Sequence, residues 1–251
     1  MSWFDFFTAK STAVQAGVNK RARSTGSAVR RYAPEISKKA QPHDRQAAID
    51  ALAKIGSAEA AAVLLKRYTF SIDPSITDQD ERDTAFRGII AAGHDALPAI
   101  RDFCANAESV TWPLRMMREL LDDPELVDEI IELLEAWDTE YHRNPDPKVQ
   151  LIGALERVKD ARVRPAVERF LEDFHEPARF HAVITLLAQD APEAAGPLAR
   201  ALVREEAVRT QDRIAEGLAM RGWVVPAADR ALLAERLPRG YRLDRDGRVV
   251  R

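Results

Sequence analysis

The stretches "DTAFRGIIAAGHDALPAIRDF", residues 83–103, and "RQAAIDALAKIGSAEAAAVLLKR", residues 45–67, carry similar residues at similar places. Each stretch predicts two short helices that meet at a glycine, because its apolar residues recur at helical spacing on both sides. Aligning Gly56 with Gly93 brings the apolar positions into register with an offset of 37 residues. This likeness indicates a repeated pair of helices.

The same frame returns three more times along the chain, in residues 146–174, 176–202 and 210–237. Residues 109–142, which lie between residues 83–103 and residues 146–174, contain two further helical stretches joined by a "DDP" turn. The turns therefore recur after 37, about 29, 37, 31 and 32 residues. The residues that align at the two main apolar positions of the first helix are Ile49 and Leu52, Phe86 and Ile89, Ile152 and Leu155, Val183 and Leu186, and Leu218 at the second position.

A period of 30 to 40 residues made of two amphipathic helices is typical of an α-solenoid, in which neighbouring pairs stack to bury a shared core. The turn residues agree with this interpretation. Gly56, Gly93 and Gly222 can adopt the left-handed conformation that ends a helix, and five prolines lie in or near the first turns of second helices. Strand-like alternation is nearly absent. The sequence predicts an all-α fold.

Over residues 43 to about 237 the chain resembles the HEAT-repeat family, including its bacterial members. In that family the second helix often opens with an aspartate that meets an arginine six residues later. Asp95 and Arg101 fit this pattern, whereas Asp160 and Asp190 face Ala166 and Gly196. The resemblance therefore rests on the period and the apolar pattern, which other helical-repeat families share in part. It implies a right-handed α-solenoid of about six antiparallel helix pairs.

Three segments are predicted. Residues 1–41 form a basic N-terminal arm, which is flexible or an amphipathic helix, and residues 42–238 form the repeat domain. In residues 239–251, apolar residues flank "DRDG", which predicts a short β-hairpin or an extended tail.

The arm and the body differ in charge. The arm carries eight Lys or Arg and two acidic residues, a net charge of +6, which leaves −9 for the rest of a chain whose total is −3. Three interpretations of the arm stay open: a leader that folds back onto the body or onto a second copy, a peripheral membrane contact, and a docking segment for another protein. The residues concerned are Trp3, Phe4, Phe7, Lys20, Arg21, Arg23, Arg30 and Arg31.

Composition narrows the functional classes. The single cysteine, Cys104, excludes an internal disulfide and metal sites built from several thiolates, and its apolar setting predicts a packing role. No run approaches the roughly 18 apolar residues of a membrane span. The N-terminus lacks the order of a secretion signal. We expect a cytoplasmic protein, with membrane association through the arm as an open alternative and homo-oligomers as another.

No catalytic constellation stands out. His175–Glu176 resembles the His–Glu pairs of the HEAT-fold hydroxylase of the deoxyhypusine type, but that di-iron site needs several such pairs and this chain has one. His175 is instead expected at the start of a helix. Trp112, Trp137 and Trp223 raise the alternative of a HEAT-like alkylpurine DNA glycosylase, against which the acidic body argues. A HEAT-like bilin lyase is a further alternative. We expect no enzyme, cofactor or metal, and no nucleic-acid partner.

The sequence therefore predicts a non-enzymatic scaffold or adaptor that binds another protein on the concave face of a helical-repeat solenoid. The contact residues should be polar or large side chains on second helices that the core does not need. By helical phase these are Lys66, Arg67, Arg101, Glu132, Glu168, Arg169, Arg200 and Arg204.

Overall fold

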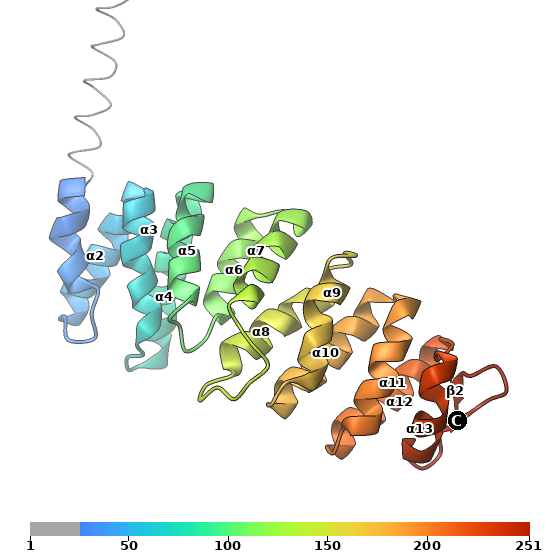
Figure 1. The fold of residues 1–251 in the computed structure, drawn as a ribbon. Coiled ribbons are helices and arrows are strands. Elements are labelled where there is room, and N and C mark those ends of the chain that lie inside the picture. Colours follow the sequence, from blue (N-terminus) through green and yellow to red (C-terminus); the bar gives the residue numbers. More distant parts are fainter. Residues whose placement is uncertain (1–25) are drawn as a thin grey trace, which may run out of the picture. The chain divides into compact units, whose positions relative to one another are not determined.

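The computed structural model describes residues 26–251, which are α-helical except for a small two-stranded sheet near the C-terminus (Figure 1). The chain divides into two compact units, the first ending at Phe103 and the second running from Cys104 to Arg251. The boundary lies inside a helix of the region that the sequence predicts as one repeat domain. Each unit is described by itself.

Helices follow one another as sequential pairs, which confirms the predicted pairing of helices along the chain. The first helices of the pairs are 9 to 17 residues long. They are α2 (Pro42–Ile55), α4 (Ser75–Ala91), α6 (Thr111–Leu120), α8 (Asp146–Ala154), α10 (Glu176–Gln189) and α12 (Val208–Arg221).

The second helices are 6 to 13 residues long, and several begin or end in a 3₁₀ turn. They are α3 (Ala58–Leu64) with η2 (Leu65–Thr69), η3 (Gly93–Ala96) with α5 (Leu97–Cys104), α7 (Asp123–Glu135), α9 (Val163–Glu168) with η5 (Arg169–Glu172), η6 (Pro192–Ala194) with α11 (Ala195–Arg204), and α13 (Ala227–Arg236). Two more 3₁₀ turns are η1 (Ala33–Glu35) and η4 (Leu155–Arg157).

The turns between paired helices use the residues that the repeat alignment places there. Gly56, Gly93 and Gly222 have φ values of 58°, 64° and 60°, in the left-handed region. Asp190 takes the same conformation with φ 56° at the aligned position. The "DDP" turn instead ends in a capping box, in which Asp122 and Glu125 each accept a backbone N–H of the other residue. Local chemistry therefore fixes where each pair bends.

The aligned apolar positions form the core. Leu52, Ile89, Leu155, Leu186 and Leu218, which the alignment superposes, are all fully buried. Phe86 is the exception at the other main position, since it is only half-buried. The periodic residues thus lie in the core, as predicted from the spacing.

In the second unit the pairs pack in two layers. The first helices form one layer, in which α6 contacts α8, α8 contacts α10 and α10 contacts α12. The second helices form the other, in which α7 contacts α9, η5 contacts α11 and α11 contacts α13. In the first unit, α2 packs on both α3 and α4.

Close approach between neighbouring first helices depends on small residues. A Cβ at Gly88 in α4 would lie 2.6 Å from Ala53 Cα in α2. A Cβ at Gly217 in α12 would lie 2.3 Å from Leu187 Cδ1 in α10. Both glycines lie five residues before a turn glycine, so the same close contact recurs at the same repeat position in these two pairs.

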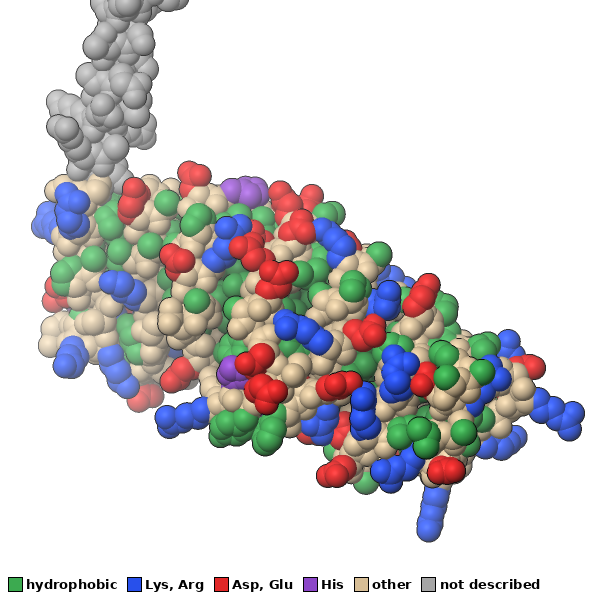
Figure 2. Space-filling model, viewed as in Figure 1, with side chains coloured by type: hydrophobic (Ala, Val, Ile, Leu, Met, Phe, Trp, Pro, Cys, Tyr) green, Lys and Arg blue, Asp and Glu red, His purple; other side chains and the backbone are tan. Residues whose placement is uncertain are grey.

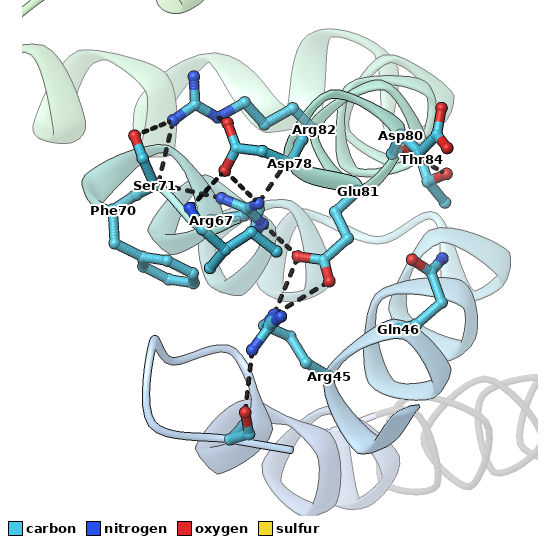
Figure 3. Close-up of polar contacts among 12 residues, drawn as sticks. Arg45, Gln46, Arg67, Phe70, Ser71, Asp78, Asp80, Glu81, Arg82 and Thr84 are labelled. Carbon is cyan, nitrogen blue, oxygen red and sulfur yellow. Dashed lines mark hydrogen bonds and ion pairs between the residues drawn. The ribbon is translucent and has the colours of Figure 1, made fainter. Parts of the chain in front are cut away.

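Charged side chains link successive helix pairs in the first unit (Figure 3) and the two helices of one pair in the second. In the first unit, Glu81 of α4 accepts hydrogen bonds from Arg45 of α2 at 2.9 Å and from Arg67 of η2 at 2.6 Å. In the second, Lys148 of α8 donates to Asp173 at 2.5 Å, and Arg179 of α10 donates to Glu205 at 2.7 Å. Arg45 and Lys148 each lie at the N-terminal end of the buried stripe of a first helix. A buried, paired charge therefore recurs at this place in two of the first helices.

The C-terminal hairpin is confirmed. Strand β1 (Arg242–Leu243) pairs antiparallel with β2 (Val249–Val250), with Leu243 opposite Val249. Gly247 in the connecting turn has φ 85°. Val249 is fully buried, and the strands contact α12 and α13. The hairpin therefore packs on the last helix pair.

The last part of the predicted arm is ordered against the first pair. Residues 26–32 are helical, Val29 and Ile36 are buried, and η1 contacts α2. Arg30 and Arg31 are exposed there. The other arm residues of interest, Trp3, Phe4, Phe7, Lys20, Arg21 and Arg23, lie outside the described residues. Across residues 26–251, every helix is too short or too polar to cross a membrane.

Candidate interaction site

A hollow with a charged lining lies in the second unit, between the second helices α9 and α11. It is an open groove of about 610 Å³, and we call it the α9–α11 groove. One wall comes from α9 and η5, and the other comes from α11. Its lining residues are Thr139, Arg164, Pro165, Glu168, Arg169, Leu171, Glu172, Pro197, Arg200 and Arg204.

The groove is lined mainly by arginine and glutamate, with a few apolar side chains between them. Four arginines and two glutamates give the lining a net charge of +2. Figure 2 shows basic and acidic side chains interspersed on the surface of this unit. The lining differs from the body as a whole, whose net charge outside the arm is −9.

Every groove arginine already has a partner within the fold. Arg164 pairs with Glu168 at 3.0 Å, and Arg204 of α11 pairs with Glu172 of η5 at 2.6 Å across the groove. Arg200 pairs with Asp229 at 3.0 Å, and Arg169 donates to the Leu134 carbonyl. Arg200 and Arg204 are half exposed, so their remaining N–H groups face solvent.

A second hollow of about 330 Å³ shares Leu171, Glu172 and Arg204 with the groove and extends it. Glu205 is buried in its wall. Burial raises the pKa of Glu205, but the hydrogen bond from Arg179 and those from backbone N–H groups outweigh burial, so its pKa is lowered overall. This end of the groove therefore holds a fixed carboxylate that is already satisfied.

The groove brings together half of the residues predicted as partner contacts. Glu168, Arg169, Arg200 and Arg204 all line it, although they come from different repeats. Glu132 is exposed on α7 but does not line the groove, and Lys66 and Arg101 belong to the first unit.

Arg67 corrects the prediction from helical phase. Its side chain is fully buried, where it donates to Glu81 and Asp78, at 2.6 Å and 2.7 Å respectively. The Phe70 ring lies 4.7 Å from its guanidinium carbon. Arg67 therefore holds the first unit together and is not available to a partner. Burial raises the pKa of Asp78, but the hydrogen bonds from Arg67 and the Ile72 N–H, together with the charges of Arg67 and Arg82, outweigh burial and lower the pKa overall.

The tryptophans do not gather at the groove. Trp223 is buried, and Trp137 is half-buried with its ring edge-to-face against His142. Trp112 lies under the guanidinium of Arg115, at 4.2 Å. A groove for flipped or stacked bases would need an aromatic side chain at its wall, and none of these three lines the α9–α11 groove.

The histidine expected at a helix start is there, but it has another role. His175 is the N-cap residue of α10, and its ring makes no capping hydrogen bond. Its Nε2 instead accepts the backbone N–H of His142 at 3.0 Å. Among residues 26–251, no three His, Cys, Asp or Glu side chains are grouped as metal ligands.

Cys104 has the packing environment that its sequence setting predicts. The side chain is buried, and burial together with the charge of Glu129 raises the pKa of the thiol to about 12. The thiolate that reacts with electrophiles is therefore scarce at neutral pH.

Sequence reasoning missed several residues at this site. Arg164 and Glu172 share the helices of the predicted contacts, and helical phase alone could have included them. Thr139 comes from the loop after α7, whose path no sequence pattern indicated.

The comparisons with known proteins identify no relative. No family model matches the chain, and neither a curated protein nor a solved structure matches it.

Proposed function

We propose that this chain is a HEAT-like, right-handed α-solenoid that acts as a non-enzymatic adaptor, and that its α9–α11 groove binds a segment of another protein. The observation that carries the proposal is the convergence of Glu168, Arg169, Arg200 and Arg204 on one open groove. These residues come from separate repeats, so only the packing of second helices side by side brings them together.

The chemistry of the groove supports a protein ligand. Arginine is enriched in protein interfaces, and apolar lining residues such as Pro165 and Pro197 offer surface to bury between the charges. A continuous positive track would favour a nucleic acid, but glutamates interrupt the arginines here. The DNA glycosylase alternative therefore has less support from this groove than a protein ligand has. Nothing in the groove favours the lyase alternative.

The ion pairs within the groove can be replaced by ion pairs with a bound partner. Exposed pairs contribute roughly 0–1 kcal/mol, because water screens them and ordering two long side chains costs entropy. Arg204 and Glu172 are both more than half exposed. A partner carboxylate can thus replace Glu172 at Arg204 with little loss of stability in the adaptor.

Affinity capture from native lysate with a groove variant tests the proposal. The variant is Arg200→Glu with Arg204→Glu, and the matched control is Arg239→Glu with Arg245→Glu, which changes the charge equally at two exposed arginines outside the groove. Proteins captured by the wild type should fall about tenfold or more with the groove variant and persist with the control. Equal capture by both variants would refute the groove as the binding site.

The arm stays a separate prediction. Its basic and aromatic residues leave membrane contact, partner docking and packing on a second copy open. A truncation after residue 25 is preferable to one after residue 41, because residues 26–41 pack on the first pair. Co-sedimentation with anionic liposomes then separates the alternatives: binding that is unchanged by the truncation argues against membrane contact by residues 1–25.

A further inference from the structure

An exposed aromatic pair stands near the α9–α11 groove. Tyr141 and Phe174 are exposed to 64% and 63%, although large aromatic side chains are usually buried. Their ring centroids lie 5.3 Å apart in an edge-to-face arrangement. The His175 ring lies 5.4 Å from each. The pair comes from two loops, one after α7 and one after η5.

The two loops are fixed to each other by hydrogen bonds. The backbone N–H of Phe174 donates to the Thr139 carbonyl at 2.8 Å, and the His142 N–H donates to His175 Nε2. Below them, buried Lys148 donates to the Asp138 carbonyl at 3.0 Å and to Asp173. The aromatic pair is therefore held in place before any partner binds, which lowers the entropy cost of binding.

The loops that carry this pair adjoin the groove. Thr139, whose carbonyl accepts the Phe174 N–H, also lines the groove. Asp173, the residue before Phe174, lines the hollow that extends it. A polypeptide lying along the groove would therefore reach Phe174 at this end.

The spacing of the groove arginines suits an extended chain. Arg200 and Arg204 are one helical turn apart on α11, a rise of about 6 Å. Alternate residues of an extended chain are about 6.6–6.8 Å apart and point to the same side. Acidic side chains at alternate positions would thus meet Arg200 and Arg204, and those between them would face the opposite wall, which carries Arg164 and Arg169.

We propose that the α9–α11 groove and the Tyr141–Phe174 pair form one site for an extended acidic segment of a partner, with a large apolar side chain at the end nearest Phe174. The segment's carboxylates replace Glu168 and Glu172 at the arginines, and its apolar side chain packs on the exposed rings. This inference rests on the proposed function, and it specifies the chemistry of the partner.

Defined peptides test the inference on the full-length protein. The probe is a fluorescein-labelled peptide with four successive acidic residues and a tryptophan on either side, so that both chain directions are covered. One comparison peptide has alanine for both tryptophans, and another has glutamine for the acidic residues. Fluorescence anisotropy should show binding of the probe, with about tenfold weaker binding of each comparison peptide.

Variants then assign each half of the peptide to its surface. Phe174→Ser with Tyr141→Ser should weaken the probe about tenfold but leave the alanine peptide unchanged, because only the tryptophan contacts the rings. The control is Val208→Ser with Met220→Ser, two equally exposed apolar residues of the same unit. Arg200→Glu with Arg204→Glu should abolish binding of both peptides, whereas Arg239→Glu with Arg245→Glu should not.

The outcomes separate this inference from the proposed function. Equal binding of the acidic and glutamine peptides, or no effect of the Phe174 and Tyr141 changes on the probe, would overturn the inference. Neither result affects the proposed function if lysate partners still depend on Arg200 and Arg204. Partner capture that is independent of those arginines would overturn both.

Discussion

The two units use arginine and glutamate in opposite ways. In the first unit, Arg67 lies at the end of one helix pair and Glu81 lies in the next pair. Both side chains are fully buried, and they are hydrogen-bonded to each other (Figure 3). In the second, Arg204 and Glu172 make a contact of the same 2.6 Å length, yet both are more than half exposed. The contact distance alone therefore says nothing about its role, because burial decides how much the contact contributes.

The difference follows from what surrounds each pair. Glu81 lies on the buried face of α4, seven and eight residues before Gly88 and Ile89, where no water reaches it. Its two arginines also use their other N–H groups on carbonyls and on Asp78. The groove pair has no such shell. The first arrangement joins repeats, and the second leaves charges available to a ligand.

Removing the buried carboxylate charge should have the largest effect. Glu81→Gln keeps the shape but leaves the guanidinium group of Arg45 buried without a counter-charge, and it leaves Arg67 with Asp78 as its carboxylate partner. We expect the free energy of unfolding of the first unit to fall by about 3–5 kcal/mol. Urea denaturation followed by circular dichroism measures the change, and hydrogen exchange of peptides from residues 42–103 assigns it to that unit.

The control for this prediction is Glu172→Gln in the groove. It removes one charge from an ion pair of equal length and should lower the free energy of unfolding by less than about 1 kcal/mol. Similar losses in the two variants would mean that burial does not separate the two regions, and the contrast would be lost.

The pairing of helices was predictable because it is written in local and periodic features. The 37-residue offset, the turn glycines and the apolar positions such as Leu52 and Ile89 gave the helix pairs and the core correctly. The hairpin at "DRDG" was predictable for the same reason. Each of these depends on residues close in sequence or on a repeat of them.

The site was predictable only in part. Helical phase found Glu168, Arg169, Arg200 and Arg204 but also selected buried Arg67, because phase does not tell whether the next helix covers a face. A signal existed: Glu81 stands within an apolar stripe, four and eight residues before Ala85 and Ile89, and such a carboxylate needs a buried cation.

The aromatic pair had no sequence signal. Tyr141 and Phe174 are 33 residues apart in loops, and contacts such as the Lys148–Asp173 pair bring them together. Loop paths of this kind depend on tertiary contacts and not on local propensity.

Glycine-to-alanine changes give a second test, which compares a tightly packed position in the first unit with a less tightly packed one in the second. Gly88→Ala puts a Cβ 2.6 Å from the backbone of Ala53, so α2 and α4 must move apart. We expect a loss of about 1–3 kcal/mol, which exceeds the gain in helix propensity of about 1 kcal/mol. Differential scanning calorimetry of the full chain would show it as a lower melting temperature.

Gly153→Ala in α8 is the matched variant in the second unit. Its new Cβ would lie 3.2 Å from His181 Nδ1 and 3.7 Å from Glu156 Oε1, and both of these partly exposed side chains can shift. We expect no loss, or a gain of up to about 1 kcal/mol from helix propensity. A loss as large as that of Gly88→Ala would show that the spacing of α8 and α10 is as tight as that of α2 and α4.

Low pH should reveal a third case, Glu205, which is intermediate between the buried Glu81 and the exposed Glu172. Glu205 is buried, yet hydrogen bonds from Arg179 and backbone N–H groups lower its pKa below the ordinary value of 4.5. A lowered folded-state pKa contributes stability that is present above 4.5 and is lost as the pH falls through the folded-state value. Glu205→Gln should therefore be less stable than the wild type at neutral pH, and the difference should shrink in acid.

Urea denaturation of the wild type and Glu205→Gln at a series of pH values from neutral to strongly acidic measures this difference. Glu172→Gln serves as the exposed comparison. A difference between wild type and Glu205→Gln that is constant across the series would mean that the stabilisation by Glu205 does not depend on its charge.

The groove pair should give the smallest effect. In a double-mutant cycle with Arg204→Ala and Glu172→Ala, we expect a coupling free energy below about 1 kcal/mol, which falls further as salt is added. The pair is short, but both side chains are mostly exposed and gain little by leaving water. A coupling above about 2 kcal/mol would make the pair a latch between η5 and α11. A partner carboxylate could then no longer displace Glu172 at small cost, and the contrast with the buried Glu81 cluster would disappear.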